Sequence, residues 1–162
     1  MNQDKLKELL AEVFSEEIKF QEEPTDMLVV ISEASFLPTL VAYLKNQLSF
    51  SFLVDICGVH FPDQTNELGV IYQLMNMETN IRIRIKVFVS KDKPEIPSLC
   101  KFYSGANWME RETYDFYGIK FLGHPNLIRI LNVEYLDYFP MRKEFALEDP
   151  TREDKDNSFF GR

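Results

Sequence analysis

The sequence predicts an α+β fold, in which helices pack on one face of a mostly antiparallel, four-stranded sheet and an irregular, extended C-terminal tail follows. Three observations predict it: two stretches with helical spacing of apolar residues, four short apolar runs, and a final segment with neither period. Two amphipathic helices on one face of such a sheet would bury every apolar stripe in the first part of the chain. We therefore expect an α+β domain over residues 1–120 and an extended arm over residues 121–162.

The chain begins with an expected helix and an expected strand. Residues 4–14 place apolar side chains on one stripe and Lys and Glu opposite, which is typical of an amphipathic helix. This stripe consists of Leu6, Leu9, Leu10 and Val13. Residues 26–32 contain a short, β-branched apolar run, which favours a strand.

A second helix is expected over residues 35–47. Ser35 can cap its N-terminus, and Pro38 lies close enough to the start to be tolerated. Its apolar stripe consists of Leu37, Leu40, Val41 and Leu44. This stripe would cover the same face of the sheet as the first helix.

Three further strands are expected. Residues 50–61 alternate, but both faces are largely apolar, which predicts a central strand covered on both sides. Residues 68–75 and 81–89 are typical of a hairpin closed around residues 78–80. The second arm of the hairpin carries Ile and Val on one face and a basic row on the other: Arg82, Arg84 and Lys86. We expect this row to be solvated, with a docking patch as the alternative.

The composition changes after residue 91. A short helix is expected around residues 98–103, and a longer one over residues 107–117. Asn107 can cap the longer helix, and Glu110 at the third helical position would complete a capping-box-like pair. Gly118 suits the left-handed position after the last turn.

The C-terminal arm lacks regular periodicity for about forty residues, which is long for a compact domain. Its content of large apolar residues is too high for a solvated chain. They are Leu122, Leu127, Ile128, Ile130, Leu131, Tyr135, Leu136, Tyr138, Phe139, Phe145, Phe159 and Phe160. We expect a partner protein to cover part of this arm.

Composition excludes several classes of function. The net charge of −8 argues against nucleic-acid binding and against direct docking on anionic lipid. The N-terminus lacks the features of a signal or transit peptide, and no apolar run approaches the roughly 20 residues that span a bilayer. These features favour a protein that is cytosolic or peripherally bound.

The Cys and His residues that could bind a metal are few and scattered along the sequence. Cys57 and Cys100 form no CxxC pair, and the histidines are His60 and His124. Iron–sulfur clusters and structural zinc sites usually take four such ligands. We therefore expect free thiols in a reducing compartment and no metal site in this chain.

One stretch carries a strong resemblance. Residues 108–121, WMERETYDFYGIKF, are followed by GHPNL at 123–127, RIL at 129–131 and PMRKEF at 140–145. These spaced elements resemble the C-subunit family of respiratory complex I, although Ile128 stands where a basic residue is common in that family. The family-motif and partner-docking residues implied are Glu110, Arg111, Glu112, Asp115, Gly118, His124, Pro125, Arg129, Pro140, Arg142 and Lys143.

The resemblance implies a non-redox assembly subunit in the hydrophilic arm of NADH:quinone oxidoreductase. Such a subunit supports electron transfer from NADH to quinone, which is coupled to proton translocation. FMN, Fe–S clusters and quinone would be bound by partner subunits and not by this chain. The implied main partner is the D subunit, with the B and I subunits nearby, on the cytoplasmic side of the bacterial inner membrane.

Two alternatives remain open. The chain could be the equivalent subunit of a membrane-bound hydrogenase or a ferredoxin-linked relative. It could instead be a stand-alone acid–base enzyme built on Glu110, Glu112 and Asp115. The sequence favours a structural role for these acids, with Arg111 and Asp115 paired at i, i+4 on the helix.

Two basic or titratable motifs complete the prediction. His124, before Pro125, is expected to bond backbone groups in a tight turn, with a proton-carrying role as the alternative. Arg142 and Lys143 lie in the irregular arm, and we expect them to pair with carboxylates of a partner.

Overall fold

The structure is a computed structural model that describes residues 2–22 and 26–145. Its helices are α1 (Gln3–Val13), α2 (Leu37–Leu48) and α3 (Ala106–Tyr117). Its strands are β1 (Ile18–Phe20), β2 (Leu28–Ser32), β3 (Phe52–His60), β4 (Leu68–Asn76), β5 (Ile81–Val89), β6 (Glu95–Pro97) and β7 (Lys120–Leu122). The expected α+β class is confirmed. Within the described ranges, no helix has both the length and the apolar character needed to cross a membrane.

The main sheet has five strands in the order β1-β2-β5-β4-β3, one more than expected. The added strand, β1, pairs with β2, and its three residues are too short to show a period. All neighbours are antiparallel except β2 and β5, which run parallel. The strands β6 and β7 form a separate parallel pair, so β7 crosses the domain boundary expected at residue 120.

The prediction that residues 50–61 form a central strand is wrong. β3 lies at the edge of the sheet and pairs with β4 alone. Its core face, which includes Leu53 and Ile56, is buried, whereas Cys57 and Val59 on the other face are only half-buried. Helix α3 packs beside this strand, and the strand's apolar character therefore reflects the helix as well as the sheet core.

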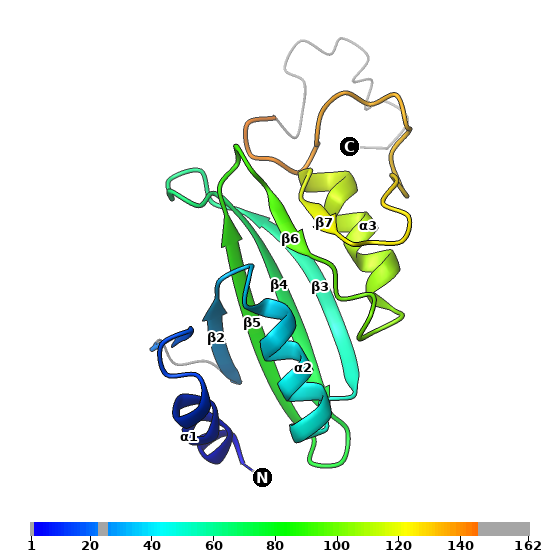
Figure 1. The fold of residues 1–162 in the computed structure, drawn as a ribbon. Coiled ribbons are helices and arrows are strands. Elements are labelled where there is room, and N and C mark those ends of the chain that lie inside the picture. Colours follow the sequence, from blue (N-terminus) through cyan, green and yellow to red (C-terminus); the bar gives the residue numbers. More distant parts are fainter. Residues whose placement is uncertain (1, 23–25, 146–162) are drawn as a thin grey trace, which may run out of the picture.

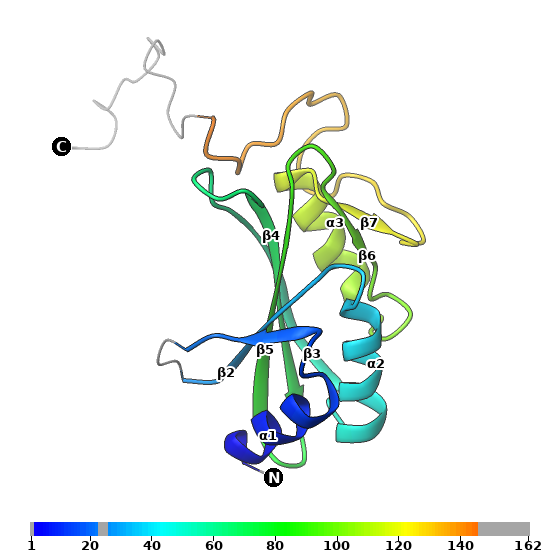
Figure 2. The same cartoon turned by 60° about the vertical axis from the view of Figure 1, so that its left-hand side comes forward.

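A single hydrophobic core fills the space between the sheet and the helices. The alternation in β5 is confirmed, because Ile83, Ile85 and Val87 are fully buried and Arg82 is exposed. The stripe of α2 is buried as expected, and that of α1 contributes Leu6 and Leu10. In Figure 1, α2 lies across the strands, and Figure 2 shows α2 and α3 on the same side of the sheet. Both views place α1 at one end of the molecule and α3 at the other.

Three local expectations are corrected. Residues 98–103 form turns and no helix. The N-cap of α2 is Phe36 and not Ser35, because Ser35 lies inside a turn closed by the N–H groups of Phe36 and Leu37 on the Glu33 carbonyl oxygen. The N-cap of α3 is Gly105, with no side-chain cap from Asn107.

Gly58 determines how closely α3 approaches β3. A Cβ at this position would lie 2.3 Å from Cδ2 of the Tyr117 ring, far inside van der Waals contact. Gly58 is on the core face of β3, opposite Val70 of β4. The last turn of α3 can therefore lie against the strand only because this position has no side chain.

We predict that Gly58→Ala lowers the free energy of unfolding by about 1–3 kcal/mol, since the added methyl group pushes the Tyr117 ring away. Urea unfolding measures the loss. Gly105→Ala is the matched control, because a Cβ there meets no atom within 4 Å; its effect should stay within about 0.5 kcal/mol. Equal losses in the two variants would contradict this role of Gly58.

Candidate docking site

The arm that follows β7 is fastened to α3 by one buried carboxylate. Asp115 is completely buried, and its Oδ2 accepts the backbone N–H groups of Ile130, Leu131 and Asn132 at 3.1, 2.8 and 2.8 Å. Its Oδ1 accepts from Arg129 Nη1 at 2.7 Å. Three successive N–H groups on one oxygen make a tight turn of the arm around the carboxylate.

The ionised form of Asp115 is strongly favoured. Burial alone would raise the pKa of this carboxyl group, but the hydrogen bonds from the Asn132 N–H and the Arg129 guanidinium, with those of the other two N–H groups, hold the pKa well below its usual range. The group is therefore held in its negatively charged form at physiological pH.

Arg129 connects several parts of the arm. Its Nη1 also donates to the Asp115 carbonyl oxygen at 2.9 Å, and its Nη2 donates to the carbonyl oxygens of Leu136 and Tyr138 at 2.7 and 3.0 Å. Only 9% of its side chain is exposed. The donors of one guanidinium thus hold this irregular loop, which has no secondary structure to fix its shape.

Phe139 packs between two arginines and against the end of α3. The guanidinium carbons of Arg129 and Arg142 lie 5.1 and 4.7 Å from the centre of its ring. Gly118, in the left-handed conformation with φ of 74°, ends the helix as the sequence predicts. A Cβ on Gly118 would lie 2.5 Å from the Phe139 ring, so this position requires glycine for both its φ and its space.

The predicted ion pair between Arg111 and Asp115 is wrong. Arg111 donates instead to the carbonyl oxygens of Ile128 and Arg129, at 3.1 and 2.9 Å, and lies over the Trp108 ring. Asp115 faces the arm, where three backbone N–H groups and the Arg129 guanidinium converge on its carboxylate. Asp115 therefore joins α3 to the arm and forms no ion pair within the helix.

Glu110 does not cap its helix. It is completely buried, and its Oε1 accepts the Leu99 N–H at 2.6 Å, while its Oε2 accepts the Ser98 hydroxyl at 2.6 Å. Burial raises the pKa of this carboxyl group, although the two hydrogen bonds oppose the rise. Glu110 thereby fixes the turn after β6 to α3, a long-range role that the sequence did not reveal.

His124 bonds backbone groups, as expected for a turn. Its Nε2 lies 3.1 Å from the Asn107 carbonyl oxygen, and its Nδ1 accepts the Asn126 N–H at 3.0 Å. The structure also brings His124 next to Glu110 and Cys100, with donor atoms of all three within 4.8 Å of one another. Cys100 and His124 are thus scattered along the sequence but are neighbours in the fold.

Of the expected docking pair, Arg142 turns inward and Lys143 stays exposed. Arg142 Nε donates to the Tyr117 carbonyl oxygen at 2.8 Å, and 12% of its side chain is exposed. Burial lowers the pKa of the Arg142 guanidinium. The backbone N–H of Lys143 donates to His60 Nδ1 at 3.0 Å. The guanidinium of Arg142 is thus engaged within the chain through Nε, and the docking role of Arg142 and Lys143 stays a prediction.

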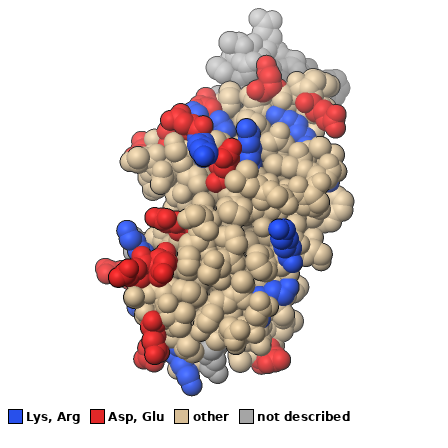
Figure 3. All heavy atoms as spheres, viewed as in Figure 1, with Lys and Arg blue, Asp and Glu red and all other residues tan. Residues whose placement is uncertain are grey.

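The arm leaves many apolar side chains outside. Tyr135, Leu131 and Leu122 are 87%, 66% and 53% exposed, and Trp108 on the outer side of α3 is 61% exposed. The other large apolar residues exposed here are Ile128, Val133, Tyr138, Met141 and Phe145. Figure 3 shows acidic and basic groups interspersed at the end of the molecule that carries α3 and the arm. This combination is typical of a protein–protein interface, with apolar anchors and a charged rim.

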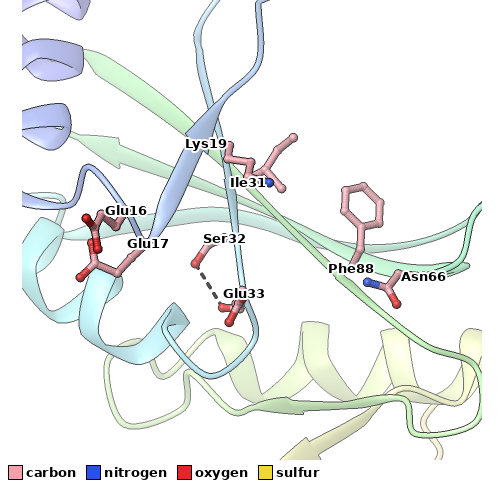
Figure 4. A pocket seen from close by; sticks show the side chains of 8 residues that line it. All are labelled: Glu16, Glu17, Lys19, Ile31, Ser32, Glu33, Asn66 and Phe88. Carbon is pink, nitrogen blue, oxygen red and sulfur yellow. Dashed lines mark hydrogen bonds between the residues drawn. The ribbon is translucent and has the colours of Figure 1, made fainter.

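The structure also has a hollow away from α3 and the arm. A cavity of about 270 Å³ beside β1 includes the exposed acids Glu16, Glu17 and Glu33 (Figure 4). In this view the first two lie on one side and Phe88 on the other, and the marked hydrogen bond runs from the Ser32 hydroxyl to the Glu33 carbonyl oxygen. The lining includes no residue of α3 or the arm, so this cavity is separate from the docking site.

Comparison with known proteins gives consistent matches. The sequence matches the family described as the respiratory-chain NADH dehydrogenase, 30 Kd subunit, over residues 29–151. The C subunit of NADH-quinone oxidoreductase from Rhizobium rhizogenes is 42% identical over 135 residues, which cover 82% of this chain and 64% of the relative. The protein of the same name from Xanthobacter autotrophicus is 42% identical over 120 residues, covering 74% and 54%. The chain thus spans about half to two thirds of the length of these relatives.

Two solved structures share the fold. A trypsin-resistant fragment of Nqo5 matches with a TM-score of 0.68 and 26% identity, covering 76% of this chain and 99% of the fragment. A chain of the membrane-bound sulfane sulfur reductase, an archaeal respiratory membrane complex, matches with a TM-score of 0.76 and 22% identity, covering 94% and 96%. The second likeness shows the fold alone.

We predict that Asp115→Asn lowers the free energy of unfolding by about 3–5 kcal/mol, because Arg129 loses its buried charge partner. Urea unfolding at neutral pH measures the change. Glu112→Gln on the exposed face of the same helix is the control and should change stability by less than about 0.5 kcal/mol. A loss below about 1 kcal/mol in Asp115→Asn would show that the Asp115 charge is not needed to hold the arm on α3.

A pH dependence follows from the same group. Since the pKa of Asp115 is lower in the folded than in the unfolded chain, where it is about 3.9, the carboxylate adds stability that is fully present above about pH 5. This contribution is lost as the pH falls through the folded-state pKa. Urea midpoints measured from pH 7 to pH 2 should fall more steeply for the parent chain than for Asp115→Asn. If the urea midpoints of the two chains fell in parallel with pH, the stabilising role of the ionised Asp115 would be contradicted.

Proposed function

The chain belongs to the family of 30 Kd subunits of respiratory-chain NADH dehydrogenase, and from this we propose that it is a structural component, the C subunit, of an NADH:quinone oxidoreductase. Its task is to bind a neighbouring subunit and stabilise the complex, which transfers electrons from NADH to quinone and couples this transfer to proton translocation. FMN, Fe–S clusters and quinone belong to the partner subunits. The name that the relatives share supports the identity of the complex.

The observation that carries the proposal is that the arm directs its polar groups toward α3 and leaves large apolar side chains exposed. Polar groups of the arm, above all Arg129 and the turn around Asp115, bond inward to α3. Apolar side chains such as Leu131 and Tyr135 remain outside. An arm held in a fixed shape without covering its own apolar groups is preorganised for a partner, because little ordering entropy is lost on docking.

The stand-alone acid–base enzyme finds no support in the geometry of its three candidate acids. Asp115 and Glu110 are buried and bonded to separate segments, while Glu112 is exposed. A pair of acids suited to proton transfer would face a common cleft. The two buried carboxylates instead join α3 to its two neighbouring segments.

The partner is proposed as the D subunit, with the B and I subunits nearby. The chain would then lie on the cytoplasmic side of a bacterial inner membrane and contact the membrane only through the complex. An equivalent place in a hydrogenase-type or ferredoxin-linked complex is the second candidate. An NADH-binding subunit in the purified complex would decide for the first candidate.

We predict that the double variant Leu131→Asp, Tyr135→Asp reduces recovery of partner subunits with the affinity-tagged chain at least roughly tenfold, because two exposed apolar anchors are lost. Co-purification from cells expressing the whole complex, with subunits identified by mass spectrometry, measures this.

Met77→Asp is the matched control. Met77 is 59% exposed, but it lies in the β4–β5 turn, away from the arm. This variant should recover the same subunits as the parent chain, and both variants should unfold at the parent urea midpoint. Full recovery of partners by the double variant would refute docking through the arm.

A further inference from the structure

Three segments meet at a small group of metal-binding side chains. Cys100 lies in the turn after β6, Glu110 in α3, and His124 in the turn after β7. One donor atom from each, a sulfur, a carboxylate oxygen and a ring nitrogen, lies within 4.8 Å of the other two. Cys100 Sγ lies 3.5 Å from Glu110 Oε2.

Glu110 is a buried carboxylate whose contacts are all with uncharged donors apart from the nearby imidazole. Among the described residues, no Lys or Arg pairs with it, whereas the equally buried Asp115 has Arg129 at 2.7 Å. A buried charge is expensive unless a cation compensates it. A bound cation at Oε2 would provide for Glu110 what Arg129 provides for Asp115.

The donor set identifies the class of ion. Sulfur and imidazole ligands select Zn²⁺ and similar divalent transition metals, whereas Mg²⁺ and Ca²⁺ require oxygen ligands. Cys100 and His124 are both half-buried, so an ion has access from solvent. Three protein ligands leave a fourth position for water.

The surroundings of Glu110 are already ordered for coordination. Its Oε1 accepts the Leu99 N–H at 2.6 Å, and its Oε2 accepts the Ser98 hydroxyl at 2.6 Å and the Cys100 thiol at 3.5 Å. An ion bound at Oε2 would replace the thiol proton, while the Leu99 N–H continues to orient the carboxylate. His124 would exchange one backbone hydrogen bond for a coordinate bond, a small loss beside the free energy of zinc binding. Binding would release the thiol proton of Cys100 to solvent.

We propose that Cys100, Glu110 and His124 form a binding site for one divalent transition-metal ion of the Zn²⁺ class, which clamps the turns after β6 and β7 onto α3. The role is structural and is independent of the proposed place in a respiratory complex.

The test is titration of the purified full chain, stripped of metal, with Zn²⁺ in a calorimeter and with Co²⁺ in a spectrophotometer. We expect one equivalent of Zn²⁺ to bind, and Co²⁺ to produce a thiolate-to-metal charge-transfer band in the near ultraviolet. Cys100→Ser should abolish this band and weaken Zn²⁺ binding at least roughly tenfold. His124→Gln should weaken Zn²⁺ binding by a similar factor and keep the thiolate band.

The chain provides a matched control for two ligands, since Cys57 and His60 are its other Cys and His. Cys57→Ser and His60→Gln should bind Zn²⁺ with the parent stoichiometry and affinity. Circular dichroism in the absence of metal separates loss of a ligand from loss of the fold. No stoichiometric binding by the parent chain, or equal binding by folded Cys100→Ser, would overturn the proposal. Neither result bears on assembly through the arm.

Discussion

The arrangement of the C-terminal half depends on one buried ion pair, that between Asp115 and Arg129. A carboxylate without exposure is tolerated because it receives three backbone N–H groups and a guanidinium. The arm contains no helix or strand between residue 123 and residue 145, so these contacts replace the hydrogen-bond ladder that secondary structure would supply. Phe139 and Gly118 then fit around the same pair. Without the Asp115 charge, the backbone N–H groups of the arm and the Arg129 guanidinium would lose the acceptor that positions them.

Sequence patterns predicted the elements that have a clear period and enough length. The row of alternating Ile and Val in β5 and the apolar stripe of α2 fall on the core face as expected. The sequence did not predict β1, because its three residues are too few to show a period. It placed β3 in the centre of the sheet, because the apolar pattern of a strand carries no information on strand order. Strand order is set by long-range pairing, and the parallel contact of β2 with β5 is an example.

The candidate site was predictable as a set of residues but not as a geometry. The motif resemblance identified Glu110, Asp115 and Arg129, yet local spacing assigned the first to a helix cap and the second to a pair with Arg111. Their real partners, in the Ser98–Leu99 turn and in the arm, lie more than ten residues away along the chain. Burial decides between such partners, since a desolvated group gains more from donors that are also desolvated. Phe159 and Phe160, which belong to the part of the arm expected to be covered by a partner, lie outside the described residues.

The parallel pairing of β2 also constrains the order in which the chain folds. Leu28 lies opposite Ile83, so β2 has only the short β1 as a neighbour until β5 has left the ribosome. The β3–β4–β5 meander is built from consecutive antiparallel neighbours and can form earlier, because its loops are short. Until then the backbone N–H and C=O groups on the β5-facing edge of β2 have no strand to pair with. Although β2 is synthesised before β3, β4 and β5, it can therefore join the main sheet only once β5 is available.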